Sequence, residues 1–209
     1  MGLPVREVAP GILHWTARHP RIGIDVSSYC LTELDVLLDP IAPAEGVGWF
    51  AEHGIAPTEI WLTNRHHYRS SAEFVADYGC TVRCHRAGLH EFSRGEAVTP
   101  FEFGDELAEG AVVHEVGAIC PEETAFHLQR AVALALADGL IRDGDGAVGF
   151  VPDHLIGDDP EPVKAGLTAA FERLLELDFE HLLLAHGEPV IGDGHVVLEE
   201  FVRSRRADG

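Results

Sequence analysis

The stretch of residues 60–78 constrains the fold of this chain more than any other. Residues 60–62 form an apolar run of the kind that a buried strand needs. A polar segment, residues 64–71, follows directly, and the residues after it have apolar side chains at helical spacing. A loop in this position lies at the carboxyl end of a strand, where open α/β sheets gather their functional groups. Because the loop contains His66 and His67, the sequence predicts a candidate site there.

The loop also has a simpler interpretation. Histidine and arginine are common in exposed loops, so His66, His67 and Arg69 could form a solvated turn. A functional role therefore depends on other polar groups that the fold brings to the same place.

One domain is the simplest interpretation of the chain's length and composition. A chain of 209 residues is long enough to bury a sizeable core. Its hydrophobic fraction of 46% and charged fraction of 24% are those of an ordinary globular protein. The sequence has no linker, repeat or low-complexity tract, so we expect a single domain over residues 1–209.

The formal net charge of −20 argues against two classes of partner. Nucleic acid and anionic membranes are bound by clustered Lys and Arg, and Lys164 is the one lysine of this chain. No apolar run approaches the roughly 20 residues of a membrane span, and the first residues lack the apolar core of a secretory signal. We therefore expect a cytoplasmic protein without a nucleic-acid or membrane partner.

The four cysteines predict buried thiols rather than a disulfide or a thiolate metal site. No two of them form a C-x-x-C pair, and thiols stay reduced in the cytoplasm. These residues are Cys30, Cys80, Cys84 and Cys120.

Hydrophobic periodicity predicts an alternation of strands and helices along the chain. Residues 5–39 are expected to be β structure with a hairpin around 33–35, and Gly79 is a plausible end of the helix that follows the polar loop. Further strands are expected at 80–84, 111–116, 125–129, 131–137 and 181–185, and helices at 43–54, 72–78, 162–177 and 196–206.

Three of the apolar strands end in polar residues. Leu62 precedes the polar loop, and Asp138 and His186 follow the ends of two later strands. If these strands lie in packed sheets, their ends could converge on one cleft. Imidazole and carboxylate groups together are typical of a zinc or iron site.

At these residues the sequence resembles the metallo-β-lactamase superfamily, over nearly the whole chain. In that superfamily a strand leads into the motif H-x-H-x-D-H, and residues 62–69 here are LTNRHHYR. Asp138 stands where a strand ending in Gly-Asp supplies a bridging aspartate, and His186 stands in a match to the closing Gly-His-Gly motif. Asp39 fits the superfamily's strand-ending aspartate. The resemblance implies an α+β fold, a four-layer αββα sandwich of two mixed sheets flanked by helices.

Several positions at which the resemblance implies metal ligands carry other residues. The first histidine of the motif is replaced by Asn64, its aspartate by Tyr68, and its third histidine by Arg69. Ala118 replaces the histidine of the superfamily's G-H-T-P-G turn. The ligand positions that survive are His66, Asp138 and His186.

This donor set is too small for two metal ions. Binuclear sites hold ions about 3.5–4 Å apart with nearly complete ligand sets, and a catalytic zinc keeps three protein ligands. By the resemblance, neither ion would keep three. Arg69 adds a permanent positive charge, so we hypothesise that it pairs with Asp138 and that Tyr68 fills the lost metal volume. His67 could assist only in a rebuilt loop, because neighbours in an extended segment point to opposite sides.

Three functions stay open. In the first, the protein has lost binuclear zinc hydrolysis, needs no cofactor, and keeps its cleft for a small, anionic ligand or a partner. In the second, it is a hydrolase with one zinc or iron ion on His66, Asp138 and His186. In the third, it is a metal-free enzyme with Tyr68, His66 and Arg69 as acid, base and anion clamp. The candidate catalytic residues are accordingly His66, Tyr68, Arg69 and Asp138.

Two plainer roles compete with these. The histidines could be hydrogen-bonded relics of the fold, and Asp138 could turn the chain by binding backbone N–H groups. No interface is specified by the acidic surface, although folds of this kind often associate as homodimers.

Overall fold

The computed structural model describes residues 2–143 and 146–207. The chain forms two compact units, Met1–Phe101 (unit 1) and Glu102–Gly209 (unit 2), which are described separately. The expectation of a single domain over residues 1–209 stays a prediction.

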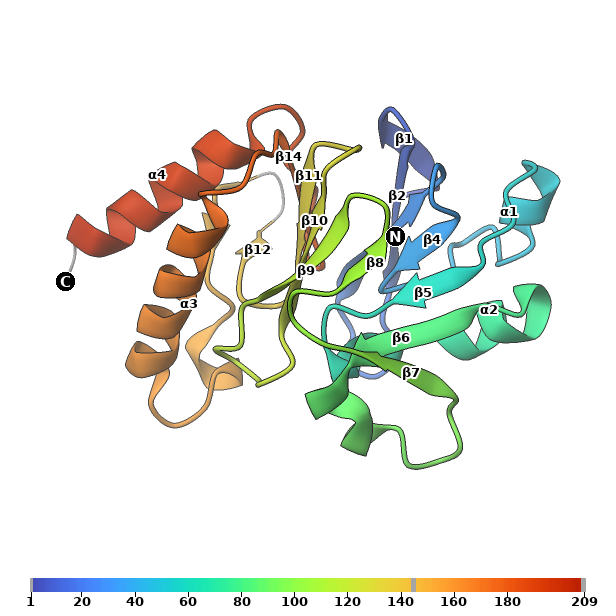
Figure 1. The fold of residues 1–209 in the computed structure, drawn as a ribbon, viewed down its shortest axis with the longest axis horizontal. Helices are drawn as coiled ribbons and strands as arrows, with labels where there is room; N and C mark the ends of the chain where they lie inside the picture. The colour runs from blue at the N-terminus through green and yellow to red at the C-terminus, as the bar shows by residue number, and fades with distance from the viewer. Residues whose placement is uncertain (1, 144–145, 208–209) are drawn as a thin grey trace. The chain divides into compact units, whose positions relative to one another are not determined.

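Unit 1 is built around a seven-stranded mixed sheet in the order β1-β2-β3-β4-β5-β6-β7 (Figure 1). The pairs from β1 to β4 are antiparallel, and those from β4 to β7 are parallel. The expected β structure at 5–39 is confirmed, including a hairpin in which Leu31 pairs with Val36. The strands are β1 (Arg6–Ala9), β2 (Ile12–Arg18), β3 (Asp25–Leu31), β4 (Val36–Leu38), β5 (Glu59–Trp61), β6 (Thr81–His85) and β7 (Val98–Phe101).

Short helices cover the apolar face of this sheet. The core of unit 1 includes Trp15, Leu37 and Ile60 of the sheet. Phe50 and Phe74 come from two helices, and their rings meet edge to face in the same core. Gly79 ends the second helix with φ 73°, as its C-cap role requires. The helical segments are α1 (Trp49–Glu52), η1 (Arg65–Tyr68), α2 (Ser71–Tyr78) and η2 (Arg86–Glu91).

The helix expected at 43–54 is wrong in extent, because only Trp49–Glu52 is helical. Gly46 adopts φ 84°, which lies outside the right-handed helical region and breaks the helix that the apolar spacing suggested. Pro43 precedes it in the turn, and Gly46 N–H donates to the Pro43 carbonyl at 2.9 Å.

Unit 2 contains a five-stranded sheet in the order β14-β11-β10-β9-β8 and a separate β12–β13 pair. The β11–β14 pair is parallel, whereas the other pairs of the larger sheet are antiparallel. The expected strands of this region are confirmed within a residue or two at their ends. They are β8 (Glu106–Ala108), β9 (Ala111–Glu115), β10 (Thr124–Leu128), β11 (Ala133–Leu136), β12 (Ile141–Arg142), β13 (Val148–Gly149) and β14 (His181–Leu184).

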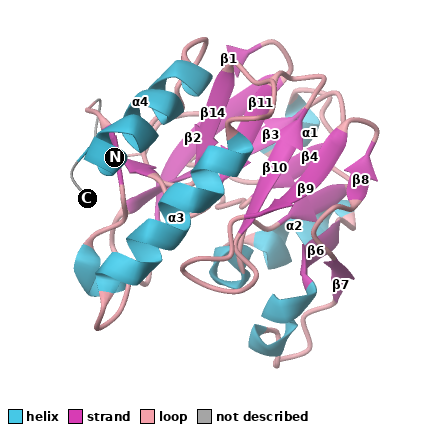
Figure 2. Ribbon diagram, turned by 60° about the vertical axis from the view of Figure 1, so that its left-hand side comes forward, coloured by secondary structure: helices cyan, strands magenta, loops and turns pink. Residues whose placement is uncertain are grey.

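Two long helices pack side by side on this sheet, as both ribbon views show (Figures 1 and 2). They are α3 (Pro160–Leu174) and α4 (Gly194–Ala207), and a short 3₁₀ turn, η3 (Asp153–Leu155), precedes them. Phe171 of α3 and Leu198 of α4 are fully buried against Leu134 and Leu182 of the sheet. In this core the helix pair packs on the parallel strands β11 and β14.

Among the described residues, no helix has both the length and the apolar character that crossing a membrane requires.

We expect the two faces of α4 to respond differently to truncation. Leu198 is fully buried, so Leu198→Ala should lower the free energy of unfolding by about 2–5 kcal/mol. Val196 lies in the same helix but is 52% exposed, so Val196→Ala should change it by no more than about 0.5 kcal/mol. Urea unfolding followed by circular dichroism measures both, and equal losses would contradict this packing.

Candidate functional site

Asp39 is the centre of a buried hydrogen-bond network in unit 1. It directly follows β4, and its side chain accepts from the Thr63 N–H at 2.8 Å and the Thr63 hydroxyl at 2.5 Å. Thr63 follows β5, the strand beside β4, so the carboxylate joins two neighbouring strand ends. The Asp39 carbonyl also accepts from the Ser28 hydroxyl at 2.7 Å. The network therefore fixes the place where the polar loop leaves the sheet.

The polar loop contains the 3₁₀ segment η1, which is kinked at His67, and is not an extended segment. The Asn64 side-chain oxygen accepts from the His66 N–H at 2.9 Å and caps η1. In this turn His67 is buried, and its Nδ1 lies 2.9 Å from the Asp39 carboxylate. We expect a role for His67 only if the loop departs from an extended conformation, and the loop does so. The premise of an extended segment is wrong because the Asn64 cap starts a turn.

The pKa of Asp39 reflects these contacts. Burial by itself would raise the pKa of this carboxyl, but His67, Arg69 and the Thr63 hydroxyl outweigh burial and hold it below its ordinary value of 3.8. The carboxylate is therefore charged at neutral pH. A charged, buried Asp39 keeps its donors in place, because each of them would otherwise lose a strong acceptor.

Arg69 ends the turn in a strained conformation, with φ 42° and ψ −115°. Such backbone costs on the order of 1–3 kcal/mol and persists only where surrounding contacts enforce it. Here the Arg69 Nη1 donates to the carbonyls of Ser27 at 2.6 Å and Asp39 at 2.7 Å. Both of these partners are neutral oxygens. The pairing of Arg69 with Asp138, which lies in unit 2, stays a prediction.

A cleft of about 270 Å³ lies in unit 1 over this turn. Its cationic lining consists of Arg21, Arg65, Arg69 and Arg94, with His19 and His66 beside them. Glu91 and Glu96 also line it. Four arginines against two glutamates leave a formal charge of +2 in a chain whose net charge is −20. The cleft is thus a local positive site of the kind that attracts anions.

Tyr68 lies in the lining of the same cleft with its ring against Phe92. Burial, and then the nearby Glu96 carboxylate, raises the pKa of the Tyr68 hydroxyl. The phenol is therefore neutral at physiological pH and keeps an O–H that can donate a hydrogen bond. The idea that Tyr68 fills lost metal volume stays a prediction.

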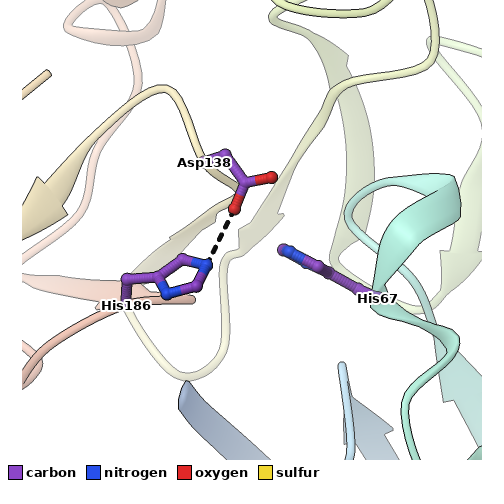
Figure 3. A group of neighbouring side chains, drawn as sticks. All are labelled: His67, Asp138 and His186. Carbon is purple, nitrogen blue, oxygen red and sulfur yellow. Dashed lines mark ion pairs between the residues drawn. The ribbon is translucent and has the colours of Figure 1, made fainter. Parts of the chain in front are cut away.

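Unit 2 brings Asp138 and His186 together at the ends of adjacent parallel strands. Leu136 ends β11 and pairs with Leu184, which ends β14, and each site residue lies two positions after its strand end. Because the register is level, the two side chains meet, with His186 Nε2 at 3.0 Å from the Asp138 carboxylate. Figure 3 draws this ion pair as a dashed line, and it also draws His67 of η1.

The glycines beside these two residues are required by close backbone contacts. A Cβ on Gly187, which has φ 88°, would lie 2.1 Å from the Arg142 carbonyl oxygen. A Cβ on Gly139 would lie 2.5 Å from a Leu167 methyl and 2.9 Å from the Glu123 carboxylate. The buried Glu123 accepts from the Gly139 N–H at 2.8 Å and so holds the turn after Asp138.

The predicted site residues thus fall into two groups. His66, Tyr68 and Arg69 line one cleft in unit 1, and Asp138 and His186 form one ion pair in unit 2. Sequence reasoning missed the structural role of His67 and the cleft residues Arg21 and Arg94. Nothing in the sequence marked these arginines, because they come from segments 19–21 and 91–96, outside the motif.

The residues present do not fit a binuclear metal centre. The oxygen of Asn64 caps a turn, Arg69 is a cation, and Ala118 offers no donor atom. A single ion is better matched, since Asp138 and His186 are a carboxylate and an imidazole, both common ligands of zinc and iron. Unit 2 then supplies two of the three protein ligands that a catalytic zinc keeps.

No model of a known protein family matches the sequence, and no curated protein matches it. Solved structures do match. The crystal structure of the DIM-1 metallo-beta-lactamase gives a TM-score of 0.72 at 13% identity, over 98% of this chain and 100% of that one. A metallo-beta-lactamase family protein from Thermus thermophilus, TTHA1429, gives 0.67 at 20% identity, over 96% and 81%. The chain has the metallo-β-lactamase fold.

This likeness confirms the predicted fold class, the αββα sandwich of metallo-β-lactamase type. A third structure with this fold, TTHA1623 in a di-iron-bound form, gives a TM-score of 0.59 at 23% identity, over 90% of this chain and 93% of that one. At these identities the comparison establishes the fold and leaves the activity to be argued from the residues.

Asp39→Asn should destabilise the protein by about 3 kcal/mol at neutral pH, because it removes the charge from a buried, paired group. The folded-state pKa of Asp39 is lowered, so its stabilising contribution is complete above the ordinary pKa of 3.8 and is lost as pH falls through the folded value. Urea unfolding between pH 7 and pH 3 should show the gap between wild type and variant closing at the acid end.

The matched control is Asp77→Asn, which changes an exposed carboxyl of α2. It should alter the unfolding free energy little at any pH. If the difference in unfolding free energy between wild type and Asp39→Asn stays constant down to pH 3, the lowered pKa is contradicted.

Proposed function

We propose that this metallo-β-lactamase-fold protein does not carry out binuclear metal hydrolysis and binds a small anionic ligand in the unit 1 cleft. The observation that carries the proposal is the group of four arginines around a cleft of about 270 Å³. A guanidinium is always charged and presents a planar fork of donors that matches carboxylate and phosphate groups. A cytoplasmic location and a homodimer remain expectations.

The residues of the polar loop support both parts of the proposal. By the superfamily resemblance, Asn64, Tyr68 and Arg69 stand at ligand positions of a metal centre. Asn64 instead caps the turn, and Tyr68 and Arg69 line the cleft. The segment that would coordinate metal therefore contributes lining residues to a positively charged cleft.

A single-metal hydrolase is the alternative, and the Asp138–His186 pair favours it. The resemblance implies His66 as a third ligand. A bound zinc or iron ion would lower the pKa of a coordinated water. The metal-free enzyme also stays open, because His66, Tyr68 and Arg69 line one cleft.

Inorganic phosphate at low ionic strength should bind wild-type protein and raise its melting temperature, since a ligand that binds only the folded state stabilises it. Arg65→Gln and Arg69→Gln should each weaken phosphate binding about 10- to 100-fold, because a hydrogen bond to a charged group is worth about 1.5–3 kcal/mol. Isothermal titration calorimetry measures the affinities.

The control for this experiment is Arg18→Gln, an exposed arginine of β2 outside the cleft lining. It should leave phosphate affinity unchanged. Because Arg69 also holds two backbone carbonyls, Arg65→Gln decides the result if Arg69→Gln loses its fold. Equal phosphate affinity in wild type and Arg65→Gln, or no binding to either, would overturn the proposed cleft.

Metal content separates the two main candidates. Protein purified without chelator, incubated with zinc or iron and dialysed, should hold fewer than one equivalent of metal by elemental analysis. One tightly held equivalent that is lost in His186→Ala and kept in the exposed control His154→Ala would favour the single-metal hydrolase instead. Two equivalents would contradict both.

A further inference from the structure

The anion cleft of unit 1 has an apolar side that its charges do not explain. Tyr68 and Phe92 both line it, and their ring centroids lie 5.7 Å apart with the ring planes tilted by 49°. Ile41 and Pro20 contribute further apolar lining. An inorganic anion is bound by charged and polar groups, so this apolar surface would not contribute to its binding.

The aromatic pair is also fixed in place. Both rings pack on the core cluster of unit 1 as partly buried side chains, so one side of each is held while the cleft side remains available. Rings in such a position offer a flat face, and aromatic groups stack or meet edge to face with a gain beyond simple area burial.

The volume of the cleft is larger than one anionic group needs. The cleft has a volume of about 270 Å³. A phosphate or carboxylate group fills only a fraction of that space. The remainder is suited to a compact organic body of about one ring.

The charged residues of the cleft leave a positive balance that attracts an anion. Arg94 and Glu96 satisfy one another, with Nε 3.4 Å from the carboxylate and the Arg94 N–H donating to it at 2.8 Å. The other charged residues of the lining are Arg21, Arg65, Arg69 and Glu91. The Tyr68 hydroxyl adds a hydrogen-bond donor to the lining.

We propose that the ligand of this cleft is a small molecule in which one oxyanion group, a carboxylate or a phosphate, is attached to a planar apolar ring. The arginines bind the oxyanion, and the Tyr68–Phe92 pair packs on the ring. This inference rests on the proposed function and specifies the ligand class of the same site.

Two matched pairs of probes test the inference by isothermal titration calorimetry. Phenyl phosphate should bind about 10- to 30-fold more tightly than methyl phosphate, and benzoate more tightly than acetate by a similar factor, because a ring removes more apolar surface from water than a methyl group does. Whichever pair binds more tightly identifies the oxyanion as phosphate or carboxylate. Arg65→Gln should weaken both members of a pair equally and leave the ratio unchanged.

Phe92→Ala should reduce the ratio of phenyl phosphate affinity to methyl phosphate affinity towards one. Phe92→Leu keeps an apolar side chain without a ring and should give an intermediate ratio, which decides the matter if Phe92→Ala does not fold. Ile22→Ala is the control, because Ile22 is 55% exposed beside Arg21 but is not part of the lining.

The outcomes separate this inference from the function on which it rests. Equal binding of phenyl and methyl phosphate, or a ratio that survives in both Phe92 variants, would overturn the inferred ring and leave the anion cleft standing. Absence of binding by all four probes would overturn the anion cleft itself and the inference with it.

Discussion

A charged carboxylate in the interior of unit 1, that of Asp39, is the interaction on which the candidate site depends. A buried charge is stable only when its partners are in place, and here they come from the next strand end and from the turn after it. Thr63 gives two donors, and His67 gives a ring nitrogen. The backbone of Asp39 binds Arg69 and Ser28 in addition. One residue thereby sets the path of the whole polar loop.

That path explains why residues of the loop line a cleft in unit 1. Because His67 turns inward to Asp39, its neighbour His66 lies in the cleft lining, where Tyr68 and Arg69 join it. The strained backbone of Arg69 is tolerated because two carbonyls hold its side chain. The same residues that stand at the motif's ligand positions thus form a positively charged surface in an acidic protein.

The strand ends of the candidate site could be predicted from sequence, whereas its local detail could not. Periodicity located the strands before Thr63, Asp138 and His186, since buried strands leave a strong apolar signal. Level register then made the Asp138–His186 pair a geometric consequence of parallel pairing. The direction of His66 and His67 was not predictable, because it depends on an Asn64 cap that turns the loop.

Other features were hidden for similar physical reasons. The helix expected at 43–54 was shortened because the positive φ of Gly46 outweighed the apolar spacing around it. Arg21 and Arg94 reach the cleft from segments far apart in sequence, and Glu123 supports the Asp138 turn by a contact across 16 residues. Long-range contacts of this kind leave no local pattern in the sequence.

The central claim is that the polar loop after β5 has exchanged metal coordination for anion binding. An anomalous-scattering diffraction map from zinc-soaked crystals tests it most directly. The account predicts at most one weakly occupied ion, beside Asp138 and His186, and none coordinated by Tyr68 or Arg69. Two fully occupied metal peaks would contradict it.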